Sequence, residues 1–378
     1  MNYEWTKEQK ELRDAIAPLF DKEAVLDLEN QEEESWSTIN NTMRRYMRLL
    51  ADKGYLEAGM EGCTKGGFFG LVCAQEFLAE QSSSLFLSLE YSSRLFGSLI
   101  AMSGSDELKE KYLSQLAKGI GIGAVAINEA ETEDGSWSTT ATCDGDYCVL
   151  TGEKPFVTNA LTADFCAVAG LLEGKPAIFI FDAGQDGIRV GDRIRTLGYR
   201  GLVVAPVKFN QMRIHKSHVI GPFENTAVLD HLKATEDFIL ALASQGVAAR
   251  AFNAAKLHAQ TYKRGGRAII KYQEVGHHLA EMMTLLQASQ FMIYRAAWMI
   301  ENRDPEASVL VDCAKIFSAD TAEQVASGAM QILASKGYQQ GNAVERAYRD
   351  AKFGGLAGTT TERARMAVAD ALIERYRI

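Results

Sequence analysis

The chain has few prolines, no long apolar run and no basic tract. Only 6 prolines occur among 378 residues, so few positions interrupt helices and long helices are expected. No uninterrupted apolar stretch approaches the roughly 20 residues that span a bilayer. The N-terminus lacks the basic and then apolar pattern of a signal peptide. The sequence therefore predicts a cytoplasmic protein with no membrane partner.

Paired cysteine motifs are also missing. The 6 cysteines are scattered and form no Cys-x-x-Cys pair, which is typical of reduced thiols in a cytoplasmic protein. The net charge is −9, so no nucleic-acid partner is indicated. An anionic ligand is still possible, because helix N-termini and local donors bind anions. His277 and His278 are adjacent and would face different sides of a helix, so no metal site is expected.

Near residue 120 the sequence changes from a helical pattern to a pattern of short strands. Residues 1–120 are predicted to be helical, and Thr6 followed by Gln9 forms a capping-box pattern at the first helix. Residues 121–223 contain short runs rich in β-branched and aromatic residues, separated by turns such as residues 144–146 (Asp-Gly-Asp). This pattern predicts a small antiparallel sheet or barrel.

The last third is predicted to be helical again. Residues 238–256 are almost wholly apolar or small, as in a helix buried on most faces. Residues 275–300 and 307–333 predict two further long helices, and four antiparallel helices would form a bundle. The predicted fold class is α+β, with an N-terminal helical domain, a middle antiparallel β domain and a C-terminal four-helix bundle. The expected domain boundaries are 1–120, 121–223 and 224–378.

One C-terminal segment identifies a family. Residues 349–365 read Arg-Asp-Ala-Lys-Phe-Gly-Gly-Leu-Ala-Gly-Thr-Thr-Thr-Glu-Arg-Ala-Arg. They resemble the acyl-CoA dehydrogenase segment Arg-Asp-Ala-Lys, a short run, then Tyr-Glu-Gly-Thr, and the helical, β, helical order is typical of the same family. Aligned from Asp350, Gly358 takes the place of the glutamate that most members use as catalytic base. Thr360 and Glu362 match residues that bind the ADP portion of FAD, although this run is also a capping pattern.

A second segment resembles the part of the family that contacts the flavin ring. Residues 154–159 read Lys-Pro-Phe-Val-Thr-Asn, similar to Lys-x-Trp-Ile-Thr-Asn. The resemblance implies that Phe156 packs against the flavin and that the Thr158 hydroxyl bonds its N5 atom. A hydride acceptor needs such an apolar wall and a donor. The alternative is a plain strand that ends in an asparagine turn.

A third segment occupies the place of the family's Thr-Glu-Pro loop. Residues 126–130 read Ala-Ile-Asn-Glu-Ala, with alanine in place of the proline. The resemblance implies that Ile127, Glu129 and Ser136 lie along the flavin and the CoA thioester arm. An acidic surface loop is the alternative.

Two further segments resemble parts of the family that bind the FAD of a neighbouring subunit. Residues 331–338 read Gln-Ile-Leu-Ala-Ser-Lys-Gly-Tyr, similar to Gln-Ile-x-Gly-Gly-x-Gly-Tyr. This resemblance implies FAD contacts from Gln331, Ser335 and Gly337, with Ala334 and Ser335 replacing two glycines. The turn is equally consistent with a helix C-terminus capped by Gly337.

The other neighbour-binding segment, Arg-x-x-Phe-Gly, falls on residues 262–266. Tyr262 stands at the arginine position. Lys263 or Arg264 could supply the charge from a shifted position, and Gln273 keeps its place in the pattern. FAD contacts from two subunits imply a homotetramer, or at least a dimer.

The missing glutamate requires another source for the base. Removal of an α-proton needs a carboxylate. In some members, including isovaleryl-CoA dehydrogenases, the glutamate lies on a bundle helix ten residues before a glycine, and counting back from Gly246 gives Glu236. A desolvated carboxylate there would have a raised pKa, although an ordinary acidic helix N-terminus is the alternative. Glu90 is a second candidate, for which an ion pair with Arg94 is the favoured interpretation.

The resemblance implies an FAD-dependent enzyme of fatty acid metabolism. It would carry out α,β-dehydrogenation of an acyl-CoA or acyl-carrier thioester and pass electrons to an electron-transferring flavoprotein. In this hypothesis the N–H of Gly358 binds the thioester oxygen. A flavin monooxygenase of the same architecture needs no α-proton base and is one alternative. A non-catalytic member that holds FAD weakly is another.

Overall fold

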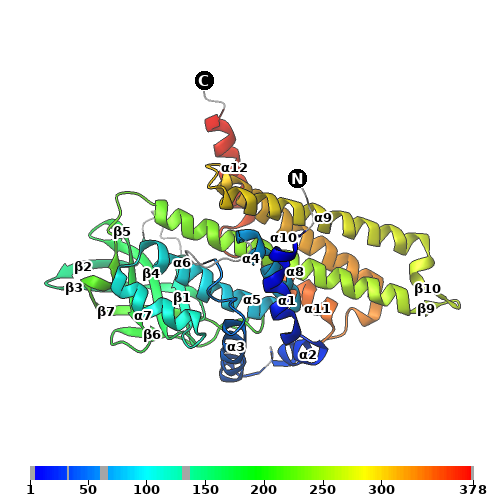
Figure 1. Cartoon of the computed structure of the whole chain (residues 1–378), viewed down its shortest axis with the longest axis horizontal. Helices are drawn as coiled ribbons and strands as arrows, with labels where there is room; N and C mark the ends of the chain where they lie inside the picture. Colours follow the sequence, from blue (N-terminus) through cyan, green and yellow to red (C-terminus); the bar gives the residue numbers. More distant parts are fainter. Residues whose placement is uncertain (1–4, 32–33, 60–66, 130–136, 376–378) are drawn as a thin grey trace.

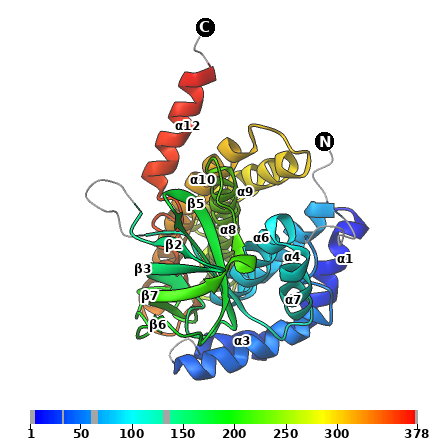
Figure 2. The same cartoon turned by 90° about the vertical axis from the view of Figure 1, so that its left-hand side faces the viewer.

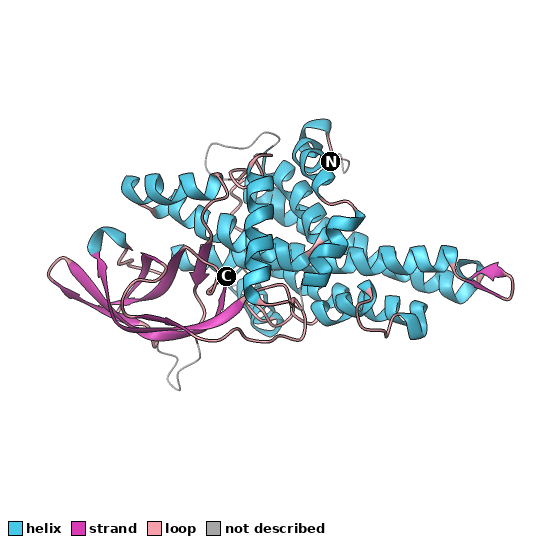
Figure 3. Cartoon of the chain, turned by 90° about the horizontal axis from the view of Figure 1, so that it is seen from below, coloured by secondary structure: helices cyan, strands magenta, loops and turns pink. Residues whose placement is uncertain are grey.

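The computed structural model describes residues 5–31, 34–59, 67–129 and 137–375. Helical, β and helical parts follow one another along the chain, which confirms the predicted fold class (Figure 1). The strands of the large sheet gather at one end of the molecule, and long helices extend from them to a small hairpin at the other end, formed by β9 (Lys263–Arg264) and β10 (Arg267–Ala268) (Figure 3). Helix α12 (Thr361–Arg375) projects away from the rest of the molecule (Figure 2).

The N-terminal part begins at the predicted capping box. The amide of Gln9 donates to Thr6 Oγ1 at 3.2 Å, and the Gln9 side chain accepts from the Thr6 amide at 3.0 Å. All described residues of α5 and of the π-helical turn η2 are buried. The elements of this part are α1 (Lys7–Ile16), η1 (Ala17–Leu19), α2 (Lys22–Gln31), α3 (Trp36–Ala51), α4 (Gly67–Gln81), α5 (Ser83–Glu90), η2 (Tyr91–Phe96), α6 (Gly97–Ser103) and α7 (Asp106–Ala117).

The middle part is one sheet with the order β6-β7-β3-β2-β4-β5-β8, in which β1 also pairs with β4. Most pairs are antiparallel, as predicted, while β1 and β2 run parallel to β4. The turn at residues 144–146 joins β2 to β3, as the sequence indicated. The strands are β1 (Gly123–Ala126), β2 (Thr140–Asp144), β3 (Tyr147–Thr158), β4 (Phe165–Leu172), β5 (Lys175–Asp182), β6 (Ile188–Val190), β7 (Val204–His215) and β8 (Val219–Ile220).

The end of β3 is tied to the N-terminal helices. The Asn159 side-chain amide donates to the carbonyl of Ser88 at 2.9 Å, and the Ser88 hydroxyl donates to Asn159 Oδ1 at 2.6 Å. Both residues are buried, so these bonds face little competition from water. They hold the strand end that carries Phe156 and Thr158 beside α5.

The C-terminal part is built on α8, which packs against α10, α9 and α4. Of the described helices, α8 alone is long and apolar enough to cross a membrane, but most of its apolar stretch is buried as in a core helix. The elements are α8 (Ala227–Thr261), β9 (Lys263–Arg264), β10 (Arg267–Ala268), η4 (Ile269–Lys271), α9 (Gln273–Glu301), α10 (Ala307–Leu333), η5 (Ala334–Lys336), α11 (Ala343–Ala351) and α12 (Thr361–Arg375).

The end of α10 differs from the expected glycine cap. The residue that follows the helix is Ala334, with φ 51° and ψ −130°. Gly337 instead follows the short turn η5 with φ −65° and packs closely against Leu333. The sequence located the turn but assigned the left-handed position to the wrong residue.

A buried contact joins the loop before β7 to α11. The Tyr199 amide donates to Asp350 Oδ1 at 2.6 Å. A Cβ on Gly198 would lie 2.6 Å from the Arg349 carbonyl oxygen, so only glycine permits this approach. The contact fixes the sheet against the C-terminal helices.

Candidate active site

Glu236 is buried in α8 where the three parts of the molecule meet. Its Oε1 accepts a hydrogen bond of 2.6 Å from the hydroxyl of Tyr91, and the nearby Asn128 side chain also favours the ionised form of the carboxylate. Burial raises the pKa of Glu236, while the Tyr91 bond opposes that rise. Desolvation of this kind makes a carboxylate a stronger base than it is in water.

Tyr91 is the first residue of the π-helical turn η2. Burial and the charge of Glu236 raise the pKa of Tyr91 well above its usual range, so it stays protonated and acts as the donor in this bond. The turn follows directly on α5, which Asn159 fixes to the sheet. One short segment thus connects the end of β3 to the carboxylate of α8.

Asp237, the next residue of α8, forms a buried ion pair with Lys315 of α10, with Nζ and Oδ1 2.5 Å apart. The same ammonium group donates to the carbonyl oxygens of Ala357 and Thr359. The Thr359 amide donates to Asp237 Oδ1 at 3.0 Å. The pair therefore fastens the turn before α12 to two long helices.

Gly358 lies at the centre of that turn, with φ 60°. A Cβ there would be 2.6 Å from Asp237 Oδ1 and 2.7 Å from Leu240 Cδ1. Both the backbone conformation and the space therefore require glycine. Among the described residues, the Gly358 N–H has no hydrogen-bond acceptor.

Phe156 and Thr158 lie near the end of β3. The Phe156 side chain is 63% exposed, so its ring is open to contact from outside the chain. Within the described part of the chain, the Thr158 hydroxyl has no hydrogen-bond partner. An exposed ring and a free hydroxyl two residues apart form a surface suited to a planar ligand.

Glu129 and Ile127 are held by Lys154. The Lys154 Nζ donates to Glu129 Oε1 at 2.7 Å and to the Ile127 carbonyl at 3.1 Å. Burial lowers the pKa of Lys154 to about 8. Burial works to raise the pKa of Glu129, but Lys154 and the donors near Ser138 lower it overall. These bonds shape the loop after β1; the predicted Ser136 lies outside the described residues.

Glu90 is bound elsewhere in the core. Its carboxylate accepts from the Tyr55 hydroxyl at 2.7 Å and from the Gln75 amide at 2.5 Å, and Arg94 lies 3.7 Å away. This agrees with the ion-pair interpretation. With both oxygens occupied by structural donors, Glu90 is poorly placed to accept a substrate proton.

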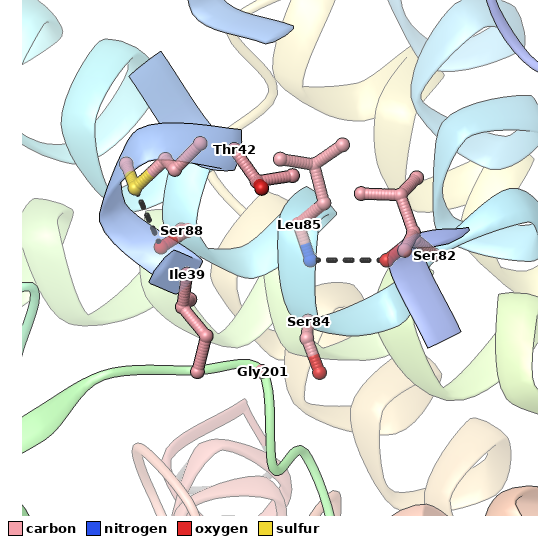
Figure 4. Close-up of a pocket in the computed structure, with 9 residues that line it drawn as sticks. Ile39, Thr42, Ser82, Ser84, Leu85, Ser88 and Gly201 are labelled. Carbon is pink, nitrogen blue, oxygen red and sulfur yellow. Dashed lines mark hydrogen bonds between the residues drawn. The ribbon is translucent and has the colours of Figure 1, made fainter. Parts of the chain in front are cut away.

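A small cavity lies between α3 and α5 (Figure 4). Ile39, Thr42, Ser84, Ser88 and Gly201 are among its lining residues, and its volume is about 30 Å³. That volume suits a single water molecule. The cavity is too small for an acyl group and is not a substrate site.

The residues predicted to bind the FAD of a neighbouring subunit lie far from Glu236. Arg264, Gln273, Gln331 and Ser335 are exposed at the distal end of the long helices, and Gly337 is buried there. Lys336 Nζ lies 5.5 Å from the centre of the Tyr262 ring, so the two predicted neighbour-binding segments adjoin. At 1.5 Å per helical residue, α8 separates them from Glu236 by roughly 40 Å.

Thr360 and Glu362 lie at the start of α12. Thr360 Oγ1 accepts from the Arg363 amide at 3.4 Å, which agrees with the capping pattern. Glu362 is exposed. Gly358 and Thr360 thus place a helix N-terminus within one turn of an N–H group that has no acceptor among the described residues.

Comparison with known proteins decides the family. The N-terminal, middle and C-terminal domain profiles of acyl-CoA dehydrogenases match residues 6–120, 128–212 and 235–373. The chain belongs to the acyl-CoA dehydrogenase family. The family is FAD-dependent and its members are oxidoreductases that act on CH–CH bonds, which confirms the predicted cofactor and enzyme class.

Individual relatives agree with this assignment. Benzylmalonyl-CoA dehydrogenase of Aromatoleum aromaticum is 30% identical over 98% of this chain and 99% of its own length. A subunit of the caffeyl-CoA reductase–Etf complex of Acetobacterium woodii is 27% identical over 84% of this chain and 89% of its own. The butyryl-CoA dehydrogenase structure from Megasphaera elsdenii shares the fold, with a TM-score of 0.89 and 23% identity over 99% of this chain and 100% of that one.

Three residues of the site were missed in the sequence. Tyr91 looked like any core aromatic, and Asn128 looked like part of a loop. Lys315 did leave a signal, because it is a charged residue among apolar positions of the predicted helix 307–333. A lysine at such a position needs a buried acceptor, and Asp237 is that acceptor.

Proposed function

We propose that this protein dehydrogenates an acyl thioester between its α and β carbons, with Glu236 as the base. The observation that carries the proposal is the buried Glu236 carboxylate, bonded to Tyr91 beside the turn that lacks the usual glutamate. Its pKa is raised by burial, as a base working near neutral pH requires. Gly358 is then a true substitution, and the carboxylate has moved to α8.

The residues present fit FAD. The exposed Phe156 ring would cover one face of the flavin, and the free Thr158 hydroxyl would bond its N5 atom. Ile127 and Glu129 would line the cofactor with the loop after β1, and Thr360 and Glu362 would contact its ADP portion. When bound, FAD supplies the acceptor for the β-hydrogen, which leaves as hydride.

The chain's own residues would divide the remaining work. Glu236 takes the α-proton, Tyr91 orients the carboxylate, and the Gly358 N–H binds the thioester oxygen, where negative charge develops. The protonated Glu236 returns its proton to solvent before the next cycle. The packed surroundings of α5 and α8 keep water from the reacting carbons.

A second copy of the chain would complete the cofactor site. Arg264, Gln273, Gln331, Ser335 and Gly337 lie roughly 40 Å along α8 from Glu236, too far to reach a flavin at Phe156 of the same chain. A neighbouring copy could bring them there, which supports a homodimer or homotetramer. Sedimentation of the purified protein with and without FAD tests this arrangement, and a monomer that retains FAD would contradict it.

The electron partner is proposed to be an electron-transferring flavoprotein. A relative that is part of a reductase–Etf complex supports this partner. The same relative is named as part of a reductase complex. The direction of electron transfer would therefore depend on the reduction potential of the partner. The proposed setting is fatty acid metabolism in the cytoplasm.

Anaerobic titration with thioesters tests the function. We expect bleaching of the bound flavin by one member of a panel of short-chain, branched and aryl acyl-CoAs and their acyl-carrier counterparts. Substrate hydroxylation by the reduced enzyme with oxygen, without anaerobic bleaching, would instead favour the monooxygenase. A colourless protein that fails to bind added FAD would favour a non-catalytic member.

A further inference from the structure

The ammonium group of Lys315 holds the chain on both sides of residue 358. It donates to Asp237 Oδ1 at 2.5 Å, to the Ala357 carbonyl at 2.6 Å and to the Thr359 carbonyl. An ammonium group has three N–H donors, so these three acceptors use all of them. Lys315 is 1% exposed and Asp237 is 2% exposed, so little water competes for the contacts.

Peptide geometry turns these contacts into a direction for the Gly358 N–H. The Ala357 carbonyl and the Gly358 N–H belong to one planar trans peptide, in which C=O and N–H point in opposite directions. Because Lys315 binds that carbonyl, the Gly358 N–H is held pointing away from Lys315. The Thr359 amide, bonded to Asp237 Oδ1 at 3.0 Å, fixes the following peptide as well.

The bonds from Asp237 and Lys315 leave the Gly358 N–H unused. Among the described residues, the Gly358 N–H has no acceptor, while the peptide groups on both sides of it are bound. The same pair fills the space that a side chain at 358 would enter, since a Cβ there would lie 2.6 Å from Asp237 Oδ1 and 3.2 Å from Lys315 Nζ. The glycine and the ion pair are therefore two parts of one arrangement.

We propose that Asp237 and Lys315 are positioning residues that aim the Gly358 N–H at the carbonyl oxygen of the acyl thioester. This rests on the proposed function and extends it to two residues that do not touch the substrate. A donor fixed before the substrate arrives needs no reorganisation when charge develops on the oxygen. In this chain a buried ion pair between α8 and α10 provides that fixation.

Infrared spectroscopy of a bound thioester detects the proposed hydrogen bond from the Gly358 N–H to the carbonyl oxygen, and the measurement needs no turnover. The probe is crotonyl-CoA with ¹³C at the thioester carbonyl, added to oxidised holoenzyme, because a hydrogen bond to the carbonyl oxygen lowers its stretching frequency. We expect a lowered frequency in the wild type. In the double variant Asp237→Asn with Lys315→Met, which leaves no unpaired buried charge, we expect the frequency to return toward its value in water.

Two controls keep structural damage separate from loss of positioning. Lys352→Met removes an exposed ion pair between Lys352 and Glu323. Glu323 lies on α10, as Lys315 does, and this control should leave the frequency unchanged. FAD content and thermal unfolding of each variant establish that the fold and cofactor are retained. If the double variant does not fold with FAD, Lys315→Arg replaces it, since its longer planar head cannot donate to the same three acceptors.

The outcomes separate this inference from the proposed function. A lowered frequency that persists unchanged in the folded variant overturns the positioning role alone. If crotonyl-CoA does not bind, the labelled enoyl thioester of the panel member that bleaches the flavin replaces it. If the wild type binds the labelled thioester without lowering the frequency, the contact at Gly358 fails and the positioning role fails with it, whereas a panel in which no member bleaches the flavin overturns the proposed function.

Discussion

The hydroxyl of Tyr91 donates a 2.6 Å hydrogen bond to Oε1 of Glu236, across 145 positions of sequence. This bond stabilises the ionised carboxylate, whereas burial raises its pKa. Asn128 and Lys315 also favour the ionised carboxylate and Asp237 opposes it, and these effects remain when the Tyr91 hydroxyl is removed. We therefore expect Tyr91→Phe to raise the pKa of Glu236 further.

The pH profile of flavin reduction measures that change. A base acts when ionised, so the rate rises with pH through the pKa of Glu236, and Tyr91→Phe should move the midpoint to higher pH and slow reduction near neutrality. Tyr55→Phe is the matched control, since it removes a 2.7 Å bond to the buried Glu90. Each variant should lose about 1–2 kcal/mol of stability, but an equal shift of both profiles would contradict the role of Tyr91.

Restoring a carboxylate at Gly358 should fail. Glu at this position would adopt φ 60° and place its Cβ 2.6 Å from Asp237 Oδ1. We expect Gly358→Glu to destabilise the protein by about 2–4 kcal/mol and to reduce the rate of flavin reduction. Thermal unfolding checks this against Gly355→Ala, whose added Cβ makes only ordinary contacts. A stable and faster Gly358→Glu enzyme would refute the close packing at this turn.

Ala334 has a conformation that suits glycine. Its φ of 51° and ψ of −130° are rarely adopted by residues with a Cβ. We expect Ala334→Gly to stabilise the protein by about 1 kcal/mol, as measured by chemical denaturation. Ala329→Gly, in the interior of α10, should instead destabilise it, and destabilisation by both would show that Ala334 is unstrained.

Asp312 should make stability depend on pH. Burial, with a smaller contribution from Asp237, raises the pKa of Asp312 from 3.8 to about 6. The folded protein therefore binds the proton more tightly than the unfolded chain, so this group's stabilising effect is complete below pH 4 and is lost as pH rises through 6. Asp312→Asn should match the wild type in melting temperature at pH 4 and exceed it at pH 7. An equal difference at both pH values would contradict this assignment.

Local patterns in the sequence predicted the elements well. Residues 307–333 have the bounds of α10 because they contain an apolar periodicity without proline. Thr6 and Gln9 predicted a cap because both partners lie within one turn. The spacing from Gly246 led to Glu236, which is buried as expected, although its catalytic role stays a proposal.

Contacts between distant residues were beyond the sequence. Lys315 and Asp237 are 78 positions apart, and no local pattern pairs them. The π-helical turn that presents Tyr91 depends on how α5 packs, since such turns have no strong sequence signal. The residue that ends α10 with positive φ was predicted wrongly. Gly337 was the expected cap because glycine adopts positive φ readily, whereas Ala334 has this conformation.

Anaerobic flavin reduction by Glu236→Gln tests the central claim most directly. Glutamine preserves the size of the side chain but cannot take the α-proton, so the rate should fall by about 10³-fold while FAD stays bound. Glu90→Gln, a matched change of a buried glutamate, should keep most of the wild-type rate if it folds. Reduction of the Glu236→Gln flavin at the wild-type rate would show that the base lies elsewhere.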